Sequence, residues 1–256
     1  MVLKRLCKLT LGFIALSSPH YLWADSLSDL QQALSSLNGN EQVSGILEVT
    51  FSEKRGDGKD QKIKTGAIKS TLSEDSNGLD ISYTQEVLRK IAQENRMKIV
   101  DEEVDTPTLN GAEILSASSL IPILSSAQTI TDYISQGEFK SESTIEYLGK
   151  EVRVLDFELP LESFIDDKKI REYVSKFEGS YKVLIDEQGV PIETRMTYSG
   201  KGSAYIFFSM KAESEIISQF KLDAGRLVRT KRAVTSNSTS TFSDRTYNGT
   251  WHLTLH

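Results

Sequence analysis

Regularly spaced apolar residues predict the elements in the first third of the chain. Four leucines recur at helical spacing in DSLSDLQQALSSLNG: Leu27, Leu30, Leu34 and Leu37. Ser26 is placed to cap this helix, and Gly39 is placed to end it. The segments VSGILEVTF, KIKTGAIKSTL and LDISYT then alternate apolar and polar positions, with turn-forming residues between them. The pattern predicts a helix followed by a three-stranded meander.

Helical spacing returns between residues 85 and 137. The segment QEVLRKIAQENRMK predicts a helix, and DEEVDTPTLNG, with Pro107, is typical of a charged loop. Residues 114–131 are eighteen residues without a charge, but their many serines and threonines argue against a membrane-spanning helix. Apolar residues after Pro122 form one helical stripe that ends at Gly137: Ile123, Ala127, Ile130 and Ile134. We expect one or two packed helices here.

Strand patterns dominate from Thr144 to the C-terminus. TIEYLGKEVRVLDFELPL predicts a hairpin around Gly149, and the segments after residue 179 alternate repeatedly between short turns. Gly200 and Gly202 are expected to flank one such turn. The alternation after them places four residues on one strand face: Ala204, Ile206, Phe208 and Met210. The predicted fold class is α+β, a strongly curved antiparallel sheet (half-barrel or open barrel) with an N-terminal helix and helices inserted mid-chain.

The first 24 residues have the pattern of a cleaved signal peptide. A basic start with Lys4 and Arg5 precedes a short apolar core, and LWA ends at Ala24. The core is too short for a spanning helix, and an uncleaved membrane anchor is the alternative. The lone Cys7 precedes the core, which argues against lipidation. We expect residues 25–256 to form a single domain in the periplasm, with no transmembrane segment.

Charge and composition exclude several function classes. The chain has a net charge of −6 and a pI near 5.3, which argues against a nucleic-acid partner. Apart from His20 in the signal segment, its histidines are His252 and His256, which alternation turns away from Trp251. A catalytic triad or a histidine-rich metal site is therefore not expected, and we predict no cofactor and no metal.

Three other groups of residues could carry chemistry. The motif S-x-x-K at Ser218 falls in a strand pattern, whereas serine–lysine catalysis needs it at the start of a helix. Acidic residues cluster at 101–105 and at 166–167, where a carboxylate-based hydrolase would need two converging acids. The basic run GRLVRTKR has side chains that regular alternation divides between both strand faces. It indicates a solvated strand or a contact to anionic head groups.

Short stretches of the chain resemble known proteins. TPTLNG (106–111), VLIDEQGVP (183–191) and GRLV (225–228) look like segments of uncharacterised secreted proteins of Gram-negative bacteria. The predicted architecture also resembles the periplasmic lipoprotein carriers (LolA-like). The first resemblance implies a location, and the second implies a half-barrel that holds lipid. No motif of the carrier family carries a binding residue over to this sequence.

A curved sheet crossed by helices leaves a cleft that can bind an apolar ligand. The candidate lining is Phe51, Ile123, Ile130, Ile206, Phe208 and Met210. The sequence thus predicts a non-enzymatic binding or carrier protein for a lipidic or apolar ligand, with a lipid or lipoprotein as partner. The alternatives are an envelope assembly or interaction protein with an envelope protein as partner, and a carboxylate-based hydrolase.

Overall fold

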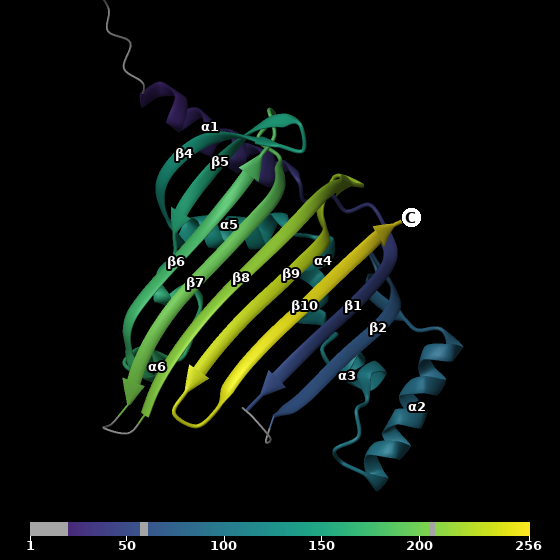
Figure 1. Cartoon of the computed structure of the whole chain (residues 1–256). Helices are drawn as coiled ribbons and strands as arrows, with labels where there is room; N and C mark the ends of the chain where they lie inside the picture. Colours follow the sequence, from purple (N-terminus) through teal and green to yellow (C-terminus); the bar gives the residue numbers. More distant parts are fainter. Residues whose placement is uncertain (1–19, 57–60, 205–207) are drawn as a thin grey trace, which may run out of the picture.

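The computed structural model describes residues 20–56, 61–204 and 208–256, and shows an α+β protein built on one antiparallel sheet of ten strands. The strand order is β3-β2-β1-β10-β9-β8-β7-β6-β5-β4, and the sheet is not closed (Figure 1). The strands are β1 (Val43–Arg55), β2 (Lys62–Asp75), β3 (Gly78–Ser82), β4 (Glu138–Tyr147), β5 (Lys150–Glu158), β6 (Val174–Ile185), β7 (Pro191–Ala204), β8 (Phe208–Asp223), β9 (Arg226–Ser240) and β10 (Asp244–Leu255).

Helices fill the connections at the start and in the middle of the chain. They are α1 (His20–Ser36), α2 (Gln85–Val100), α3 (Pro107–Glu113), α4 (Ala117–Leu124), α5 (Ala127–Gln136), the short 3₁₀ helix η2 (Leu161–Ser163) and α6 (Lys168–Arg171). The predicted N-terminal helix, the meander of β1 to β3 and the pair of mid-chain helices are confirmed. Within these helices, none is long and apolar enough to cross a membrane.

Tight turns set the strand register. Leu148 and Gly149 both have positive φ angles, 52° and 76°, as a two-residue turn of the β4–β5 hairpin requires. Ala224 and Gly225 repeat this arrangement between β8 and β9, with φ angles of 50° and 70°. Because β1 pairs with both β2 and β10, the last strand lies beside the first.

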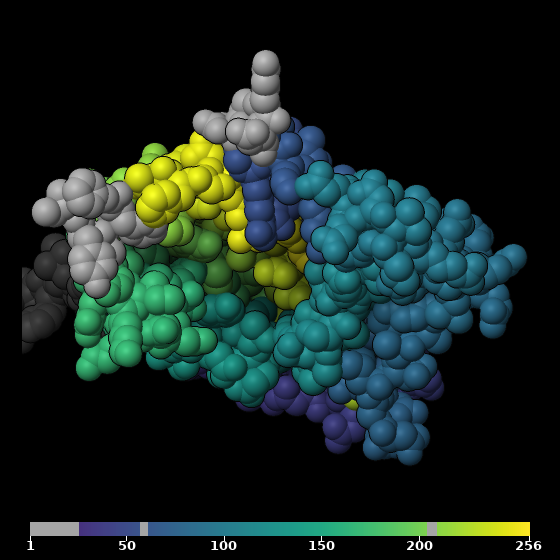
Figure 2. Space-filling view, turned by 90° about the horizontal axis from the view of Figure 1, so that it is seen from below, coloured from purple at the N-terminus to yellow at the C-terminus, as the bar shows by residue number. Residues whose placement is uncertain are grey.

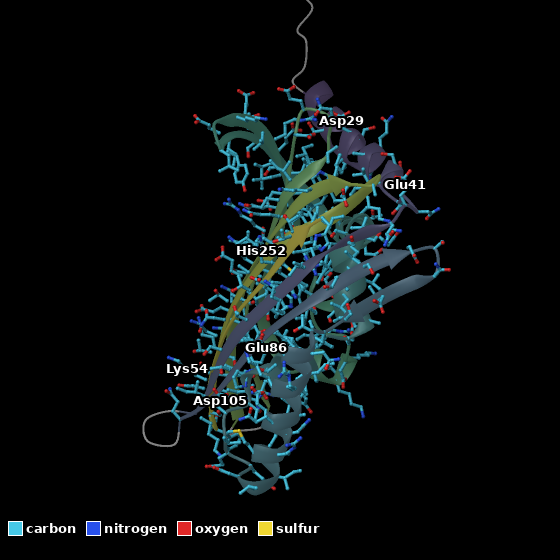
Figure 3. The ribbon with its side chains drawn as sticks, turned by 90° about the vertical axis from the view of Figure 1, so that its right-hand side faces the viewer. Asp29, Glu41, Lys54, Glu86, Asp105 and His252 are labelled. Atoms are coloured by element: carbon cyan, nitrogen blue, oxygen red, sulfur yellow. The ribbon has the colours of Figure 1, made fainter. Side chains whose placement is uncertain are left out.

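Helices α1, α4 and α5 pack on one face of the sheet, here called the helix face, and the opposite side is the open face (Figures 1 and 3). One buried cluster joins α1 and α5 to β5, β6 and β7, through residues such as Leu30, Ile130 and Val183. A second joins α4 to β1, β2 and β10, through residues such as Leu120 and Val49. Alternation places His252 on the open face, as Figure 3 shows.

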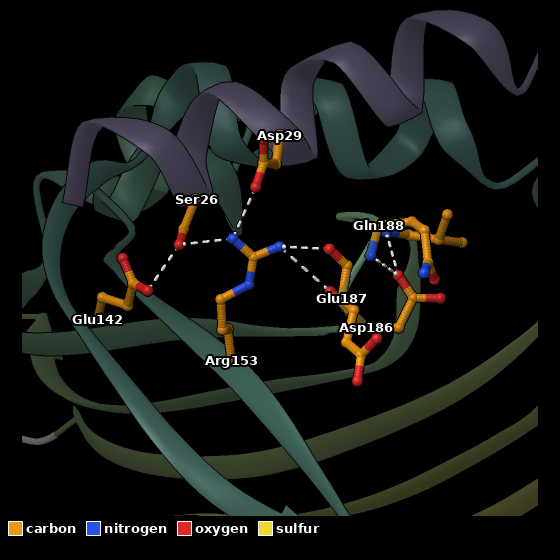
Figure 4. Close-up of polar contacts among 8 residues, drawn as sticks. Ser26, Asp29, Glu142, Arg153, Asp186, Glu187 and Gln188 are labelled. Carbon is orange, nitrogen blue, oxygen red and sulfur yellow. Dashed lines mark hydrogen bonds and ion pairs between the residues drawn. The ribbon is translucent and has the colours of Figure 1, made fainter. Parts of the chain in front are cut away.

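A polar network anchors α1 to the sheet (Figure 4). Arg153 of β5 donates to Asp29 at 2.7 Å and to the Ser26 hydroxyl at 2.9 Å, and it also reaches the carbonyl of Asp186 at 3.2 Å. The Ser26 hydroxyl in turn donates to Glu142 at 2.6 Å. Ser26 therefore lies inside α1 and bonds to β4 and β5, so the expectation that it caps the helix is wrong.

Two further expectations are corrected by the strand boundaries. Gly200 and Gly202 lie within β7 and not at a turn, because β7 continues to Ala204. Residues 204 and 208 face each other across the β7–β8 pair, so the segment 204–210 is not one strand. Ile206 is outside the described residues.

The stretch expected as a charged loop contains helix α3. Pro107 begins it, and proline is favoured at a first helical position because its fixed φ suits the helix and its missing N–H has no partner there. Gly111 lets α3 approach β2 closely, since a Cβ there would lie 2.9 Å from Ile68 and 3.0 Å from the Ala67 backbone. The signal-peptide prediction concerns residues 1–24, most of which lie outside the described residues.

Candidate ligand-binding site

The middle of the helix face carries a polar band between two apolar ends. Cross-strand pairing aligns one row of residues over eight strands: Leu155, Val183, Thr194, Ser218, Arg232, Trp251, Val49 and Ile68. Thr194 and Ser218 are each 5 % exposed. Buried polar side chains in a core position need a structural or functional reason. Here they lie beneath α4 and α5.

A β-bulge in β9 places two arginines in the same hollow. Arg229 pairs with Phe220 and Lys231 pairs with Gln219, so Thr230 is an extra residue without a partner in β8. The extra residue shifts the alternation by one position. Arg229 and Arg232 therefore share the helix face, although regular alternation would separate them.

A cavity of about 220 Å³ lies between α4, α5 and strands β6 to β9. Its lining combines apolar, hydroxyl and cationic side chains: Ser118, Ser119, Pro122, Ser126, Thr129, Ile130, Tyr133, Tyr181, Thr194, Met196, Ile216, Ser218, Phe220, Arg229 and Arg232. Among these described residues none is acidic. Seen from the lower end of the molecule, Figure 2 shows a hollow between the yellow C-terminal strands and the teal helices.

Serine side chains fix the start of α4 and the junction between α4 and α5. Ser116 and Ser119 form a capping box at the start of α4. At the junction with α5, the Ser126 hydroxyl donates to the Pro122 carbonyl at 2.7 Å, and the Ser126 N–H donates to the Leu227 carbonyl of β9 at 2.8 Å. The hydroxyls satisfy local carbonyls, and the junction is fixed to the sheet next to Arg229.

The two arginines of the cavity, both half-buried, differ from Arg226, the buried arginine of β9. Arg226 donates to Glu74 at 2.8 Å, whereas neither Arg229 nor Arg232 forms an ion pair with a described acidic residue. The Nε atoms of Arg229 and Arg226 are both inaccessible to solvent and lack a hydrogen-bond partner among the described residues, so the difference between the two arginines is the ion pair. Burial, with repulsion from Arg232 in second place, lowers the pKa of Arg229 to about 10. Arg229 still carries its charge at neutral pH.

Aromatic rings surround this charge. The guanidinium of Arg232 lies over the ring of Trp251, with its central carbon 5.0 Å from the ring centroid. Tyr133 of α5 and Tyr181 of β6 pack with ring centroids 5.2 Å apart, and burial raises the pKa of Tyr181. These side chains provide ring faces and hydroxyl groups around a cationic centre.

The structure brings together only part of the predicted lining. Ile130 lines the cavity, while Ile123, 2 % exposed, packs in the core beneath α4. Phe51 is 7 % exposed and stacks on Tyr247, with ring centroids 5.8 Å apart. Met210 is 43 % exposed in a separate depression near the β7–β8 connection. Phe208 begins β8, and its side chain, like the whole of Ile206, is outside the described part.

The sequence pattern missed Arg229 and Arg232 as site residues. The basic run was visible, and contact with anionic groups was one of its two interpretations. Nothing in the letters GRLVRTKR indicates the bulge at Thr230, because a bulge depends on pairing with β8. Arg229 and Arg232 were missed because the strand pairing is irregular at this point. Their residue types were visible in the sequence.

Acidic residues of both predicted clusters form local ion pairs, hydrogen bonds and a helix cap. Glu103 binds Lys62 at 2.7 Å, and Asp105 accepts a hydrogen bond from Thr65 at 2.8 Å. Asp167 caps α6. A wider depression on the open face contains Glu158 and Glu178, which bind Lys140 and Lys176 at 2.7 and 2.8 Å. Within the described ranges, no three His, Cys, Asp or Glu side chains are placed to share a metal ion.

Comparison with known proteins adds no family. No family model matches the chain, and neither a curated protein nor a solved structure matches it. The resemblances to secreted Gram-negative proteins and to lipoprotein carriers stay predictions.

Proposed function

We propose that this chain is a non-enzymatic binding or carrier protein for a lipidic or apolar ligand, acting in the periplasm after removal of residues 1–24. The observation that carries the proposal is the cavity between the serine-rich helices and the sheet. Protein interiors are normally filled to crystal-like density. A hollow lined by Ile130, Met196 and Phe220 therefore has to be accounted for.

The size of the cavity defines what it can hold. At about 220 Å³ it is smaller than the roughly 300–1,000 Å³ of pockets that enclose drug-sized ligands. It accommodates one end of a long-chain ligand, and the rest extends into the hollow seen in Figure 2. A sheet that curves around α4 and α5, as the sequence pattern predicts, gives this hollow its walls.

Native mass spectrometry of protein purified from cells tests the proposal. We expect a bound lipid mass, and uptake of the fluorescent fatty acid cis-parinaric acid by protein from which lipid has been removed. Thr129 of α5 lines the cavity, so Thr129→Trp fills it and lowers uptake. The neighbouring Gln128 is exposed, so Gln128→Trp is the matched control and leaves uptake unchanged.

Two results would count against the proposal. One is a clean protein mass together with no uptake of the fatty acid. The other is equal uptake by the Thr129→Trp and Gln128→Trp variants, because binding would then take place outside the cavity.

A second candidate function, an envelope interaction protein, is favoured by helix α2. This helix has no buried residue, and Ile99 and Val100 at its end are 83 % and 89 % exposed. Exposed apolar side chains grouped at one helix end are typical of a protein contact. Crosslinking in cells separates the two functions: a reproducible protein partner that is lost in Ile99→Glu, with no bound lipid, supports the second.

A further inference from the structure

We infer that Arg229 and Arg232 bind the anionic head of the ligand, a carboxylate or a phosphate, inside the cavity. This inference rests on the proposed function and specifies its ligand as an anionic amphiphile. It comes from three observations: the two charges lack acidic partners in the described part of the chain, they share one hollow, and hydroxyl groups surround them.

Neither cavity arginine has an acidic partner among the described residues. A buried charge costs several kcal/mol unless it is paired. In this chain Arg226, Arg153 and Arg195 each meet a carboxylate at 2.8 Å or less. Arg229 and Arg232 are half-buried and line one cavity without an acidic partner among the described residues, and their charges repel each other. An anion between them removes both penalties at once.

Both arginines line the same cavity. The bulge at Thr230 aims both guanidinium groups into the cavity. Each guanidinium presents several N–H donors in a plane, which suits the paired oxygens of a carboxylate or phosphate. Thr194 and Ser218 lie on the same row of the sheet as Arg232 and add hydroxyl groups. The cavity therefore offers donors and positive charge, with no acidic group among its described lining residues.

The cavity also has an apolar lining. A site for a free inorganic anion needs no apolar wall, yet Ile130, Met196 and Ile216 line the same cavity. These residues fit the first carbons of a chain attached to the anionic head. The head then lies beneath the α4–α5 junction, and the chain runs toward the hollow of Figure 2.

Matched probes test the inference. Oleate and methyl oleate share a chain and differ in charge, as do lysophosphatidate and monooleoylglycerol; inorganic phosphate supplies the anion without a chain. Isothermal titration calorimetry measures the binding of each probe by the wild type and by every variant. We expect the delipidated protein to bind oleate at least about tenfold more tightly than methyl oleate, since hydrogen bonds to charged groups are worth about 1.5–3 kcal/mol.

The variants locate the effect. Arg229→Gln with Arg232→Gln abolishes the preference for the acid, while methyl oleate binds as before. Lys231→Gln removes a charge from the same strand, but its side chain is exposed on the open face, so the preference remains. Circular dichroism of each variant verifies that it is folded.

The outcomes separate this inference from the proposed function. Equal binding of acid and ester, unchanged in the double variant, overturns the arginine site and leaves an apolar-ligand protein. Binding of inorganic phosphate alone, lost in the double variant, supports the anion site and overturns the lipid carrier. Binding of no probe overturns both. A preference for lysophosphatidate over oleate identifies the head as a phosphate, and the reverse identifies a carboxylate.

Discussion

Three arginines of β9 show how position decides the role of one residue type. Arg226 is 5 % exposed and paired with Glu74, Arg229 has no acidic partner among the described residues, and Arg232 stacks on Trp251. The first stabilises the fold through a charge pair. The second is a charge that burial disfavours, as its lowered pKa shows. An arginine whose charge is disfavoured by burial fits a binding role better than a structural one.

Substitution of these arginines by methionine is expected to have opposite effects on stability. Arg229→Met removes a half-buried charge that has no acidic partner among the described residues, so it raises the free energy of unfolding of the delipidated protein by about 1–2 kcal/mol. Arg226→Met leaves Glu74 without its partner, so it lowers the same quantity by about 3 kcal/mol. Urea unfolding at pH 7 measures both. A loss of stability in Arg229→Met would indicate that this side chain is part of the core.

At the scale of elements, the mid-chain helices combine two tasks. Their inner stripe packs on the sheet, and part of it borders the cavity. Ile123 in α4 and Ile130 in α5 are 2 % and 1 % exposed, yet only Ile130 lines the cavity. Burial alone therefore does not distinguish a packing residue from a lining residue. The distinction depends on what lies opposite each side chain.

Alanine substitutions separate these two isoleucines. Ile123→Ala is expected to lower the free energy of unfolding by about 3 kcal/mol, because it opens a cavity in the core, and to leave the affinity for cis-parinaric acid unchanged. Ile130→Ala is expected to weaken that affinity about fivefold, through loss of apolar contact with the ligand. Urea unfolding and fluorescence titration check the pair. If Ile123→Ala weakened binding as much as Ile130→Ala, the ligand would lie deeper under α4.

The elements themselves were largely predictable, and their exceptions have local causes. Alternation correctly predicts the meander of β1 to β3 and the hairpin at Gly149, and apolar spacing predicts α2 and α5. Alternation fails at 204–210, since the end of β7 and the start of β8 together continue the pattern of a single strand. It fails at Arg229 and Arg232 because the bulge depends on the neighbouring strand. Pairing between distant segments is what the local pattern cannot supply.

At the scale of the whole molecule, β9 joins the two buried clusters. Leu227 belongs to the cluster under α1 and α5, and its neighbour Val228 belongs to the cluster under α4. The cavity arginines follow directly after these two residues, in the strand that both clusters share. The ligand would therefore bind where the two halves of the core meet, which couples occupancy to the stability of the whole sheet.

Acid should weaken the whole molecule. The carboxyl groups with a shifted pKa in the described part of the chain all have it lowered: Glu48, Glu53, Glu86, Glu103, Glu178 and Glu193. A lowered pKa means that the unfolded chain binds protons more readily than the folded one. The stability from these groups is present above the ordinary value of 4.5 and is lost as the pH falls through their folded pKa values.

Glu193 is the sharpest test, because it is 2 % exposed and accepts hydrogen bonds from Tyr147 at 2.6 Å, Gln219 at 3.0 Å and Arg195 at 2.6 Å. Burial opposes ionisation, but these donors outweigh it and lower the pKa of Glu193. Glu193→Gln is expected to cost about 1–2 kcal/mol at pH 7 and less at pH 3, because below the ordinary value of 4.5 the unfolded wild-type chain gains a proton that the folded carboxylate binds less readily. Urea unfolding at both pH values measures the difference. Tyr147→Phe removes one of these donors, so the free energy of unfolding should fall less between pH 7 and pH 3 than it does in the wild type. If Glu193→Gln costs the same at pH 3 as at pH 7, the carboxylate is not held ionised by its neighbours.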